Sequence, residues 1–378
     1  MLKRILAAAA AVTMLGFNAF SAGAAVYGDY EYIGSTFYMS ADVTKYNGSA
    51  ESVTVPSYFG DFKVTKLTNT FYKNKTVKNV VIPETVTELA SGVFNGCSEL
   101  LSVTLPSGIT KMDDLTFYEC TKLESITIPG GVTEIAKNAF GRCRALKTVT
   151  IPKSVTSIGY QAFQSCSDLA KLSIGGGVTE IGTKAFTECN SLKKVTVPGN
   201  VKTIGSNAFE SCKVLATVNI KKGTSEIGAE AFKACPALTD VTLPDSIKTV
   251  GDRAFVNCKN LTEIYIPASV TQIGDHAFGF GYYNSTYTKY PLTICCARGS
   301  AAEAYARQYG FTCNYYSGIA GDANADGHVN MKDVTTVQRH INGWTVEISI
   351  QAADLDGNNT VNMKDLASLQ RLVNGWEA

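Results

Sequence analysis

The sequence predicts a repeat solenoid of short parallel strands and short helical or 3₁₀ turns, followed by a small all-α module. Two observations lead to this fold class. Cysteine and phenylalanine recur every 23 residues through the middle of the 378-residue chain. The period then changes to 32 over residues 321–378, where a loop rich in Asp and Asn is repeated. A fixed period of this length is the signature of stacked structural units, each too small to bury its own apolar face.

Composition and charge exclude several functional classes. Apolar residues make up 45% of the chain and charged residues 18%, which is typical of a globular protein and not of a disordered one. The formal net charge is +1, without a long block of like charges, which argues against a nucleic-acid binder. The three histidines have no metal-ligand spacing such as HExxH, so a zinc enzyme or a His-centred hydrolase is disfavoured.

The first 25 residues have the pattern of a secretory signal peptide. Lys3 and Arg4 precede the apolar stretch 5–15, and the small residues 22–24 offer a cleavage site. A transmembrane anchor is the alternative, but the apolar run is short and Asn18 interrupts it. Removal of residues 1–25 leaves 32 basic against 33 acidic residues. The pattern predicts a secreted protein with no membrane span in its mature form.

Two residue types mark the 23-residue period. The cysteines are Cys97, Cys120, Cys143, Cys166, Cys189, Cys212, Cys235 and Cys258. The phenylalanines are Phe71, Phe94, Phe117, Phe140, Phe163, Phe186, Phe209, Phe232, Phe255 and Phe278. A leucine also follows each of these cysteines by three positions, from Leu100 to Leu261. This agreement over ten units predicts stacked copies of one structural element.

Each unit divides into two halves, as the copy at 143–165 illustrates. Its apolar positions are Leu146, Val149, Ile151, Val155, Ile158, Ala162 and Phe163. Alternation around Val149 predicts a short strand, which Pro152 ends because proline has no N–H for a ladder. Gly159 then permits a turn, and the Ala-Phe pair is expected to pack a helical or 3₁₀ turn against the strand. Stacking buries all these side chains in one column.

The repeat resembles the BspA-type leucine-rich repeat, through its I-P, V-T-x-I-G and A-F-x-x-C elements. The resemblance covers about residues 27–316 and implies a solenoid with a parallel sheet on one face. It places repeats at 70–290, an aromatic N-terminal cap at 26–69 and a C-terminal cap at 291–316. The C-terminal cap includes a short helix at 299–306. Residues 317–320 are the expected linker.

The cysteine column permits metal, redox or disulfide interpretations, but a buried ladder of small apolar side chains is favoured. The C-x-x-C spacing of a zinc site is absent, and Asn74 and Gly281 take the column's place in the end units. Parallel thiols on neighbouring turns would also be too far apart for disulfides. Outside the ladder, the sequence leaves the pairing of the remaining cysteines open. These are Cys295, Cys296 and Cys313.

Two solenoid surfaces are candidates for a ligand. The first is the polar strand face, where one outward column runs from Asn79 to Glu263 and the next from Val81 to Tyr265. Its threonines are explained either by strand propensity or by a concave protein or glycan surface. The second is the insert 282–290, whose tyrosines could stack on sugars or pack as part of the cap. No catalytic constellation recurs in the repeats, so an enzyme is not predicted.

The C-terminal segment carries the most specific chemistry, because two twelve-residue loops offer oxygen ligands at the positions that calcium requires. The ligands predicted in the first loop are Asp322, Asn324, Asp326, His328, Asn330 and Asp333. Those of the second are Asp354, Asp356, Asn358, Thr360, Asn362 and Asp365. His328 and Thr360 would contribute backbone carbonyls. Two calcium ions are therefore predicted, each loop being followed by a helix, at 333–342 and 365–374, with Gly343 and Gly375 at the C-caps.

This module resembles a type I dockerin over residues 321–378. The resemblance implies calcium-dependent folding and binding to a cohesin module of a scaffoldin in a cellulosome. The contacts that it implies are Met331, Lys332, Gln338 and Arg339, or the equivalent Met363, Lys364, Gln370 and Arg371. Met-Lys departs from the small hydroxyl residues usual at loop positions 10 and 11. The fold class is thus a leucine-rich-repeat β/α solenoid followed by an all-α dockerin with two calcium-binding loop–helix (F-hand) motifs.

These features together predict a secreted, non-catalytic interaction protein. The dockerin would anchor it to a cellulosome, and the solenoid would bind an unknown protein or glycan in support of polysaccharide degradation or adhesion. One alternative is a dockerin-borne hydrolase acting on plant polysaccharide or peptide. Another is a structural spacer.

Overall fold

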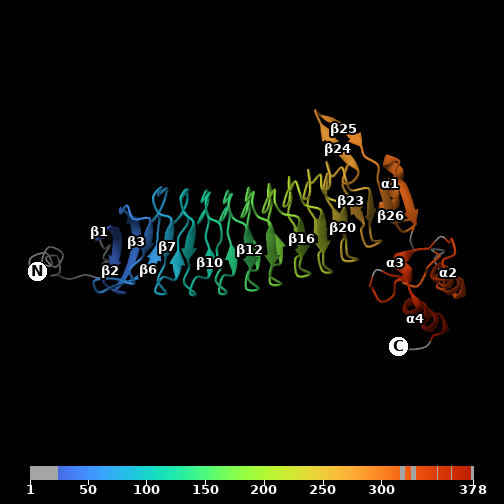
Figure 1. Ribbon diagram of the computed structural model, residues 1–378, viewed down its shortest axis with the longest axis horizontal. Helices are drawn as coiled ribbons and strands as arrows, with labels where there is room; N and C mark the ends of the chain where they lie inside the picture. The colour runs from blue at the N-terminus through green and yellow to red at the C-terminus, as the bar shows by residue number, and fades with distance from the viewer. Residues whose placement is uncertain (1–23, 316–319, 325–328, 347, 359, 376–378) are drawn as a thin grey trace, which may run out of the picture.

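The computed structural model describes residues 24–315, 320–324, 329–346, 348–358 and 360–375. The predicted signal peptide at 1–25 lies almost entirely outside these residues. The described chain forms a β-solenoid of about 12 turns with a spacing of about 23 residues, followed by a helical module (Figure 1). The predicted fold class is therefore confirmed.

An aromatic sheet begins the solenoid. In spatial order its strands are β1 (Ala24–Tyr27), β2 (Tyr30–Ser35), β3 (Ser40–Tyr46), β6 (Phe62–Leu67) and β5 (Tyr58–Phe59), with β8 (Glu88–Leu89) pairing with β6. The buried rings of Tyr30, Tyr46 and Phe59 pack against one another beneath it. Tyr46 also contacts Phe71, with ring centroids 5.4 Å apart. The sheet therefore covers the first phenylalanine of the repeats, as expected of a cap.

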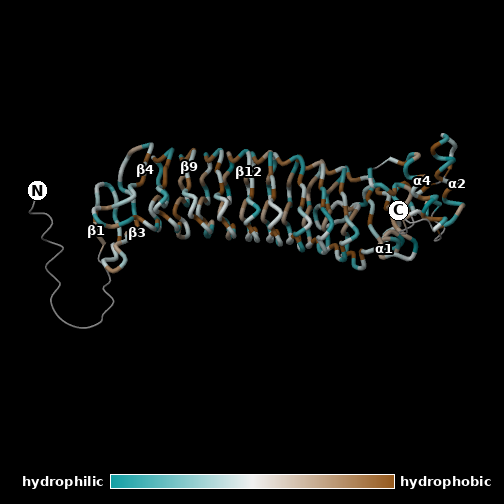
Figure 2. Tube along the Cα trace, turned by 90° about the horizontal axis from the view of Figure 1, so that it is seen from below, coloured by the Kyte–Doolittle hydropathy of each residue, from teal (hydrophilic) through white to brown (hydrophobic). Residues whose placement is uncertain are grey.

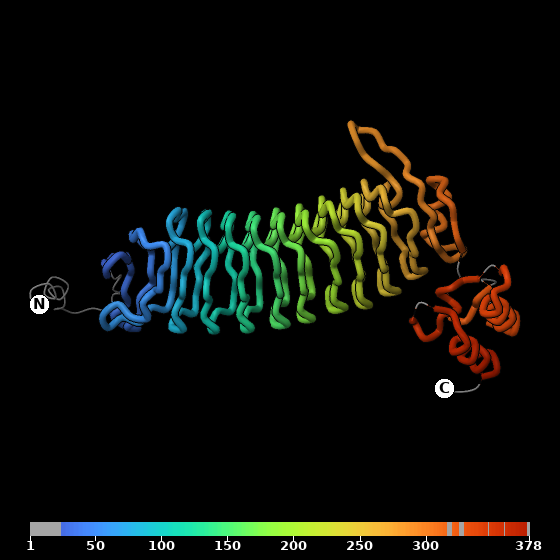
Figure 3. The backbone as a smooth tube through the Cα atoms, in the orientation of Figure 1, coloured from blue at the N-terminus to red at the C-terminus, as the bar shows by residue number. Residues whose placement is uncertain are grey.

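Most turns contribute a first strand, and these strands pair in parallel in groups of two or three. Figure 3 shows the turns stacked along the solenoid. These strands are β4 (Ser52–Thr54), β7 (Asn79–Val81), β9 (Ser102–Thr104), β12 (Thr148–Ile151), β14 (Lys171–Ile174), β16 (Lys194–Val197), β18 (Thr217–Ile220), β20 (Asp240–Thr242) and β22 (Glu263–Tyr265). Side chains alternate between core and solvent, so that Val149 is buried while Thr148 and Thr150 are exposed. The period-two pattern of the sequence is thereby confirmed.

A second strand follows in each turn, which the sequence analysis did not anticipate. The strands are β10 (Lys111–Met112), β11 (Glu134–Ile135), β13 (Ser157–Ile158), β15 (Glu180–Ile181), β17 (Thr203–Ile204), β19 (Glu226–Ile227), β21 (Thr249–Val250) and β23 (Gln272–Ile273). They form one eight-stranded parallel sheet. Each is only two residues long, so its own alternation is too short to reveal a strand. The pairing emerges only when turns stack in register.

In each repeat of residues 70–290, the segment after the second strand was expected to form a helical or 3₁₀ turn. It is instead a series of hydrogen-bonded turns. In the unit at 143–165, Gln161 has φ 54° and Ser165 has φ 55°. Residues with positive φ recur at both positions in the following units, as at Lys184 and Glu188. A left-handed residue every few positions interrupts helical geometry, because L-residues in a right-handed helix keep φ negative. This detail of the prediction is corrected.

The glycine after the second strand serves close packing rather than a special backbone conformation. Gly159, Gly182 and Gly205 do not have positive φ. A Cβ built on Gly182 would lie 2.6 Å from the carbonyl oxygen of Ile158 and 2.8 Å from the carbonyl carbon of Gly159. The turns therefore approach each other here too closely for any side chain.

We expect Gly182→Ala to destabilise the solenoid by about 1–3 kcal/mol, because the new methyl must displace backbone of the preceding turn. Gly176→Ala is the matched control, since nothing lies within 4 Å of its built Cβ. That variant should be neutral or slightly more stable, through reduced entropy of the unfolded chain. Urea unfolding followed by circular dichroism measures both. Equal midpoints for the two variants would contradict the close-packing explanation.

The core is two ladders of identical side chains. Ten phenylalanine rings, from Phe71 to Phe278, stack with neighbouring centroids 4.9 to 5.3 Å apart and are nearly parallel. The eight cysteines from Cys97 to Cys258 are buried beside them. Apolar residues recur in every turn of the backbone (Figure 2). One continuous hydrophobic column results, as the period predicted.

The cysteine ladder is hydrogen-bonded to the backbone. Each Sγ donates to the carbonyl of a phenylalanine in the preceding turn, as from Cys143 to Phe117 (3.1 Å) and from Cys166 to Phe140 (3.2 Å). Burial raises the pKa of both thiols well above the ordinary value, which suppresses the reactive thiolate. All eleven cysteines are free thiols in the described residues, those outside the ladder included.

A hairpin and a helix close the far end of the solenoid. The hairpin consists of β24 (Phe280–Tyr283) and β25 (Thr286–Lys289) and projects from the last turns (Figure 1). Within the predicted tyrosine insert, Tyr287 stacks on His276 at 3.6 Å, whereas Tyr283 is 79% exposed. The insert is therefore partly a packing element and partly a free surface.

Helix α1 (Ala301–Tyr309) confirms the short helix predicted near residue 300. Ser300 caps its start by accepting from the Glu303 N–H, and Gly310 ends it in the left-handed conformation with φ 68°. The Tyr305 hydroxyl donates to the Phe278 carbonyl at 2.8 Å, which covers the last ring of the ladder. Strands β26 (Thr293–Cys296) and β27 (Thr312–Tyr315) extend the first-strand sheet from β22.

The C-terminal module contains α2 (Met331–Ile341), α3 (Ile350–Ala353) and α4 (Met363–Asn374). Both long helices begin two residues earlier than predicted, because Asn330 and Asn362 are their N-caps. Gly343 and Gly375 have positive φ just beyond the helix ends, as the sequence indicated. The module has its own small core of Ala323, Val334, Val337, Ala353, Leu366 and Leu369.

Candidate functional site

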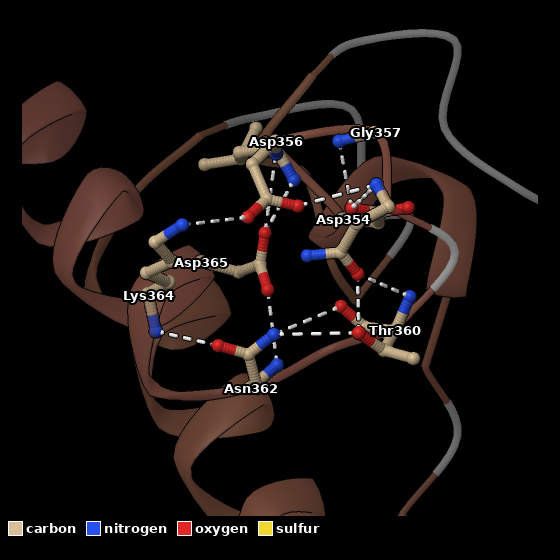
Figure 4. Close-up of polar contacts among 9 residues, drawn as sticks. Asp354, Asp356, Gly357, Thr360, Asn362, Lys364 and Asp365 are labelled. Carbon is tan, nitrogen blue, oxygen red and sulfur yellow. Dashed lines mark hydrogen bonds and ion pairs between the residues drawn. The ribbon is translucent and has the colours of Figure 1, made fainter.

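The second loop gathers three carboxylates at one point (Figure 4). Oxygen atoms of Asp354, Asp356 and Asp365 all lie within 4.8 Å of one another. The three residues occupy positions 1, 3 and 12 of the loop, so residues up to eleven positions apart meet because the chain turns back before α4. Asn358 and Thr360 lie on the exposed part of the same loop.

The first loop is described only in part. Asp322 and Asp333 are both buried, and Asn324 and Asn330 are half-buried. The Asn324 N–H donates to Oδ1 of Asp333 at 3.0 Å, which ties loop position 3 to position 12. The predicted ligands Asp326 and His328 lie outside the described residues. The described part repeats the arrangement of the second loop.

The aspartate at position 12 organises each loop. Asp365 accepts from the N–H groups of Leu355 (2.9 Å), Asp356 (3.2 Å) and Asn362 (3.0 Å). Burial by itself raises the pKa of this carboxyl, but the backbone N–H groups of Asn362, Asp356 and Leu355 outweigh it and hold the pKa below the ordinary value. The group is therefore an anion at neutral pH, as a calcium ligand must be.

Position 9 has a capping role that the sequence analysis missed. Oδ1 of Asn330 accepts from the Lys332 N–H at 2.9 Å, and Oδ1 of Asn362 accepts from the Lys364 N–H at 2.9 Å. With the aspartate three residues later, each forms a capping box at the start of its helix. The Asn-x-x-Asp spacing in both copies is the signal that could have revealed it. The side chain of each asparagine would thus serve both as the predicted calcium ligand and as the helix cap.

The donor set of the second loop fits a hard divalent cation. All candidate donors are carboxylate, amide or carbonyl oxygens, which calcium prefers. Three carboxylates this close repel one another unless a cation sits between them. Lys364 supplies only partial compensation, because its Nζ lies 3.8 Å from Asp356 and its side chain is 82% exposed. Calcium would supply the missing charge and join the two ends of the loop.

The residues implied as partner contacts lie on the outside of the helices. Met331 is 56% and Met363 60% exposed, although both open an amphipathic helix. Their neighbours Lys332 and Lys364 are exposed as well. Further along the helices, the exposed set consists of Arg339, Gln370 and Arg371, while Gln338 is half-buried and hydrogen-bonded to Asn342. The module therefore presents an apolar-basic face twice, once at the start of each long helix.

The strand face of the solenoid is the other candidate surface. Both outward columns are solvent-facing along their length, with Thr217, Asn219 and Tyr265 the half-buried exceptions. Ion pairs link neighbouring turns near its start, such as Lys78 with Glu51 at 2.7 Å and Lys147 with Glu124 at 2.8 Å. Among the helices of the described residues, none has the length and apolar character needed to cross a bilayer.

Comparison with solved structures returns bacterial leucine-rich-repeat proteins. A leucine-rich cell surface protein from Faecalibacterium prausnitzii is 27% identical, with 79% of this chain and 96% of that one covered and a TM-score of 0.49. A leucine-rich repeat protein from Bacteroides ovatus is 19% identical, with 78% and 100% covered and a TM-score of 0.46. The leucine-rich repeat protein of T. pallidum is 20% identical, with 77% and 98% covered and a TM-score of 0.34. The chain matches none of the curated proteins compared with it.

Two family models match the chain, one over the solenoid and the other over the C-terminal helical module. The type I dockerin domain matches residues 320–374, which hold both loop–helix units. Dockerins of this type are calcium-binding modules. The BspA-type leucine-rich repeat region matches residues 65–193 and 179–293. Together these two matches cover more than half of the chain, which therefore belongs to the BspA-type leucine-rich-repeat family and carries a type I dockerin at its C-terminal end.

Proposed function

We propose that this chain is a secreted, non-catalytic interaction protein that its dockerin anchors to the cohesin module of a cellulosome scaffoldin. The observation that carries the proposal is the pair of loop–helix units, each with an exposed Met-Lys pair, within the dockerin match. Two calcium ions hold the units folded, one in each loop. The signal-peptide pattern at 1–25 is the basis for secretion.

The proposal also assigns roles to the parts of the chain. Residues 26–69 and 291–316 cap the repeats at 70–290, residues 317–320 link them to the dockerin, and residues 321–378 bind the cohesin. The solenoid binds a ligand that supports polysaccharide degradation or adhesion. Its continuous apolar core and solvent-facing polar strands suit a rigid display surface rather than a reaction site.

The test is capture of the full chain on immobilised cohesin modules. We expect binding to a cohesin in calcium, loss of binding on addition of EGTA, and loss after deletion of residues 320–378. Failure to bind any cohesin of a broad type I panel in calcium would contradict the docking role. Hydrolysis of polysaccharide or peptide by the pure protein would contradict the non-catalytic assignment if the activity persists after the dockerin is deleted.

A further inference from the structure

The charge of the chain is concentrated in one part of the solenoid. Residues 144–222 contain eleven basic and four acidic residues, whereas the rest of the chain contains 23 basic and 29 acidic ones. Of the four acidic residues, Glu180 starts the second strand of its turn, and Glu188 and Glu210 lie in the turn segments, away from the first strands. The fourth, Asp168, is exposed three residues before β14. Part of the basic excess lies on the first-strand face, where Lys171 and Lys194 open their strands and Lys147 and Lys193 directly precede theirs.

Three lysines on that face form what we call the lysine stripe: Lys171, Lys193 and Lys194. Lys171 opens β14 and Lys194 opens β16, with Lys193 directly before it, and all three are exposed. In the described part of the chain no carboxylate forms an ion pair with them. Lysines at the position of Lys193 in earlier turns are paired, as Lys78 is with Glu51 and Lys147 with Glu124, whereas the position of Lys171 and Lys194 holds Asn, Ser or Thr in those turns. The three ammonium groups of the stripe therefore lie close together without a carboxylate partner in the described residues.

The first-strand sheet is interrupted after β9, between β14 and β16, and between β20 and β22, and the stripe lies at the second of these interruptions. β12 pairs with β14, and β16 pairs with β18, but no backbone ladder joins β14 to β16 in the described residues. Leu172 and Ile174 of β14 are only partly buried, whereas Val149 and Ile151 of the preceding strand are 1% exposed. A shallow depression of about 300 Å³ lies over β12 and β14, next to this gap. Its lining includes Lys171 and Lys194.

Hydroxyl groups surround the lysines, and aromatic rings do not. Thr148, Thr150 and Ser173 line the same depression. The aromatic residues of 144–222 are Tyr160 and three ladder phenylalanines, none of them on the first strands. Protein interfaces favour aromatic anchors and contain few lysines, and single-stranded nucleic acids use aromatic stacking. The surface therefore suits a hydrophilic anion with many hydroxyl groups.

The stacking also sets a spacing. Turns repeat about every 5 Å along the solenoid, as the 5.2 Å separations of Phe163, Phe186 and Phe209 show. A linear polymer lying across the turns would meet ammonium groups on two successive turns, that of Lys171 and that of Lys193 and Lys194. Acidic sugars carry one carboxylate on each residue together with free hydroxyls, which match the lysines and the threonine and serine side chains.

We propose that the lysine stripe binds a linear acidic polysaccharide of the polyuronate class. The proposal rests on the proposed function, which brings the chain to plant cell-wall polysaccharide, and it deepens that function by naming the ligand class of the solenoid. Lys171, Lys193 and Lys194 bind the carboxylates, and the hydroxyl side chains around the depression bind the sugar hydroxyls. The contacts are electrostatic and exposed, so affinity falls as salt rises.

The test is affinity electrophoresis and titration calorimetry of the full chain in calcium with polygalacturonate. We expect binding that weakens at high salt, and at least tenfold weaker binding by the variant Lys171→Gln, Lys193→Gln, Lys194→Gln. A matched control removes three paired lysines, Lys45→Gln, Lys78→Gln and Lys122→Gln, and should keep most of the affinity. Fully methyl-esterified polygalacturonate, which has the same backbone without charge, should not bind.

Three outcomes overturn the proposal: no binding of polygalacturonate at low salt, equal losses in the two triple variants, or equal binding of polyglutamate or DNA. The last would show a general polyanion surface or an acidic macromolecular partner. Cohesin capture of the same variants separates this proposal from the docking function. The stripe variant should bind cohesin normally, so loss of polyuronate binding with intact capture concerns the stripe alone, and loss of capture concerns the dockerin.

Discussion

Chelation of calcium should unfold the dockerin and leave the solenoid folded. Three of the described acidic residues of the module, Asp322, Asp333 and Asp365, are buried, and the described part of its core is a small cluster of buried side chains with partly buried ones packed against it. Such a small core is marginal by itself. One site at a calcium concentration a thousandfold above its Kd contributes about 4 kcal/mol, which is comparable with the whole stability of a small domain. The solenoid is stabilised by its apolar column, so chelation should leave its stability unchanged.

Differential scanning calorimetry of the full chain measures this result. In calcium we expect two transitions, of which the smaller disappears in EGTA while the larger keeps its Tm. The variant Asp354→Asn, Asp356→Asn should reduce the smaller transition even in calcium. The control is Asp240→Asn, Asp245→Asn on the solenoid, where the same charge change should leave it intact. If EGTA changes neither the size nor the Tm of the smaller transition, the calcium assignment is refuted.

Disrupting both Met-Lys pairs of the dockerin should abolish cohesin binding, whereas disrupting either one should cost almost nothing. The two copies have similar backbone geometry at their N-caps. The N-cap Asn330 has φ −153° and ψ −172°, and Asn362 has φ −142° and ψ −171°. Both pairs are exposed directly after the cap, and α2 packs against α4 around one core. Folding explains the matching aspartates and glycines, but not identity at exposed Met-Lys.

A module that presents one face twice can bind its partner in two orientations related by about 180°. Losing one of two equivalent modes costs RT ln 2, about 0.4 kcal/mol. The variants are Met331→Asp with Lys332→Asp, Met363→Asp with Lys364→Asp, and all four together. Aspartate in the first helical turn is favourable, so the helices should remain folded. Titration calorimetry against a cohesin that binds the unaltered protein gives the affinities. Loss of binding in one single-copy variant alone would establish one fixed face instead.

The candidate site shows how far a linear pattern can predict a metal site. The twelve-residue spacing predicts the ligand types and their order, because calcium coordination by a loop is a local property of the chain. The meeting of Asp354, Asp356 and Asp365 agrees with that expectation in the second loop. Asn330 and Asn362 belong to the loops and also cap the helices, and this second role depends on where each helix begins. That boundary is decided by cooperative hydrogen bonding and lies two residues before the predicted one.

By itself, the sequence determined the properties that repeat: the 23-residue period, the phenylalanine and cysteine ladders, the first strand of each turn and the two loop–helix units. These follow from side-chain type and spacing, and the same types and spacing recur in every copy. Only the tertiary structure decided the contacts between turns. The second strand has no pattern of its own, Gly182 is small because backbone from the previous turn meets it, and the sheet opens between β14 and β16. Such features arise from how copies stack, so no single copy contains them.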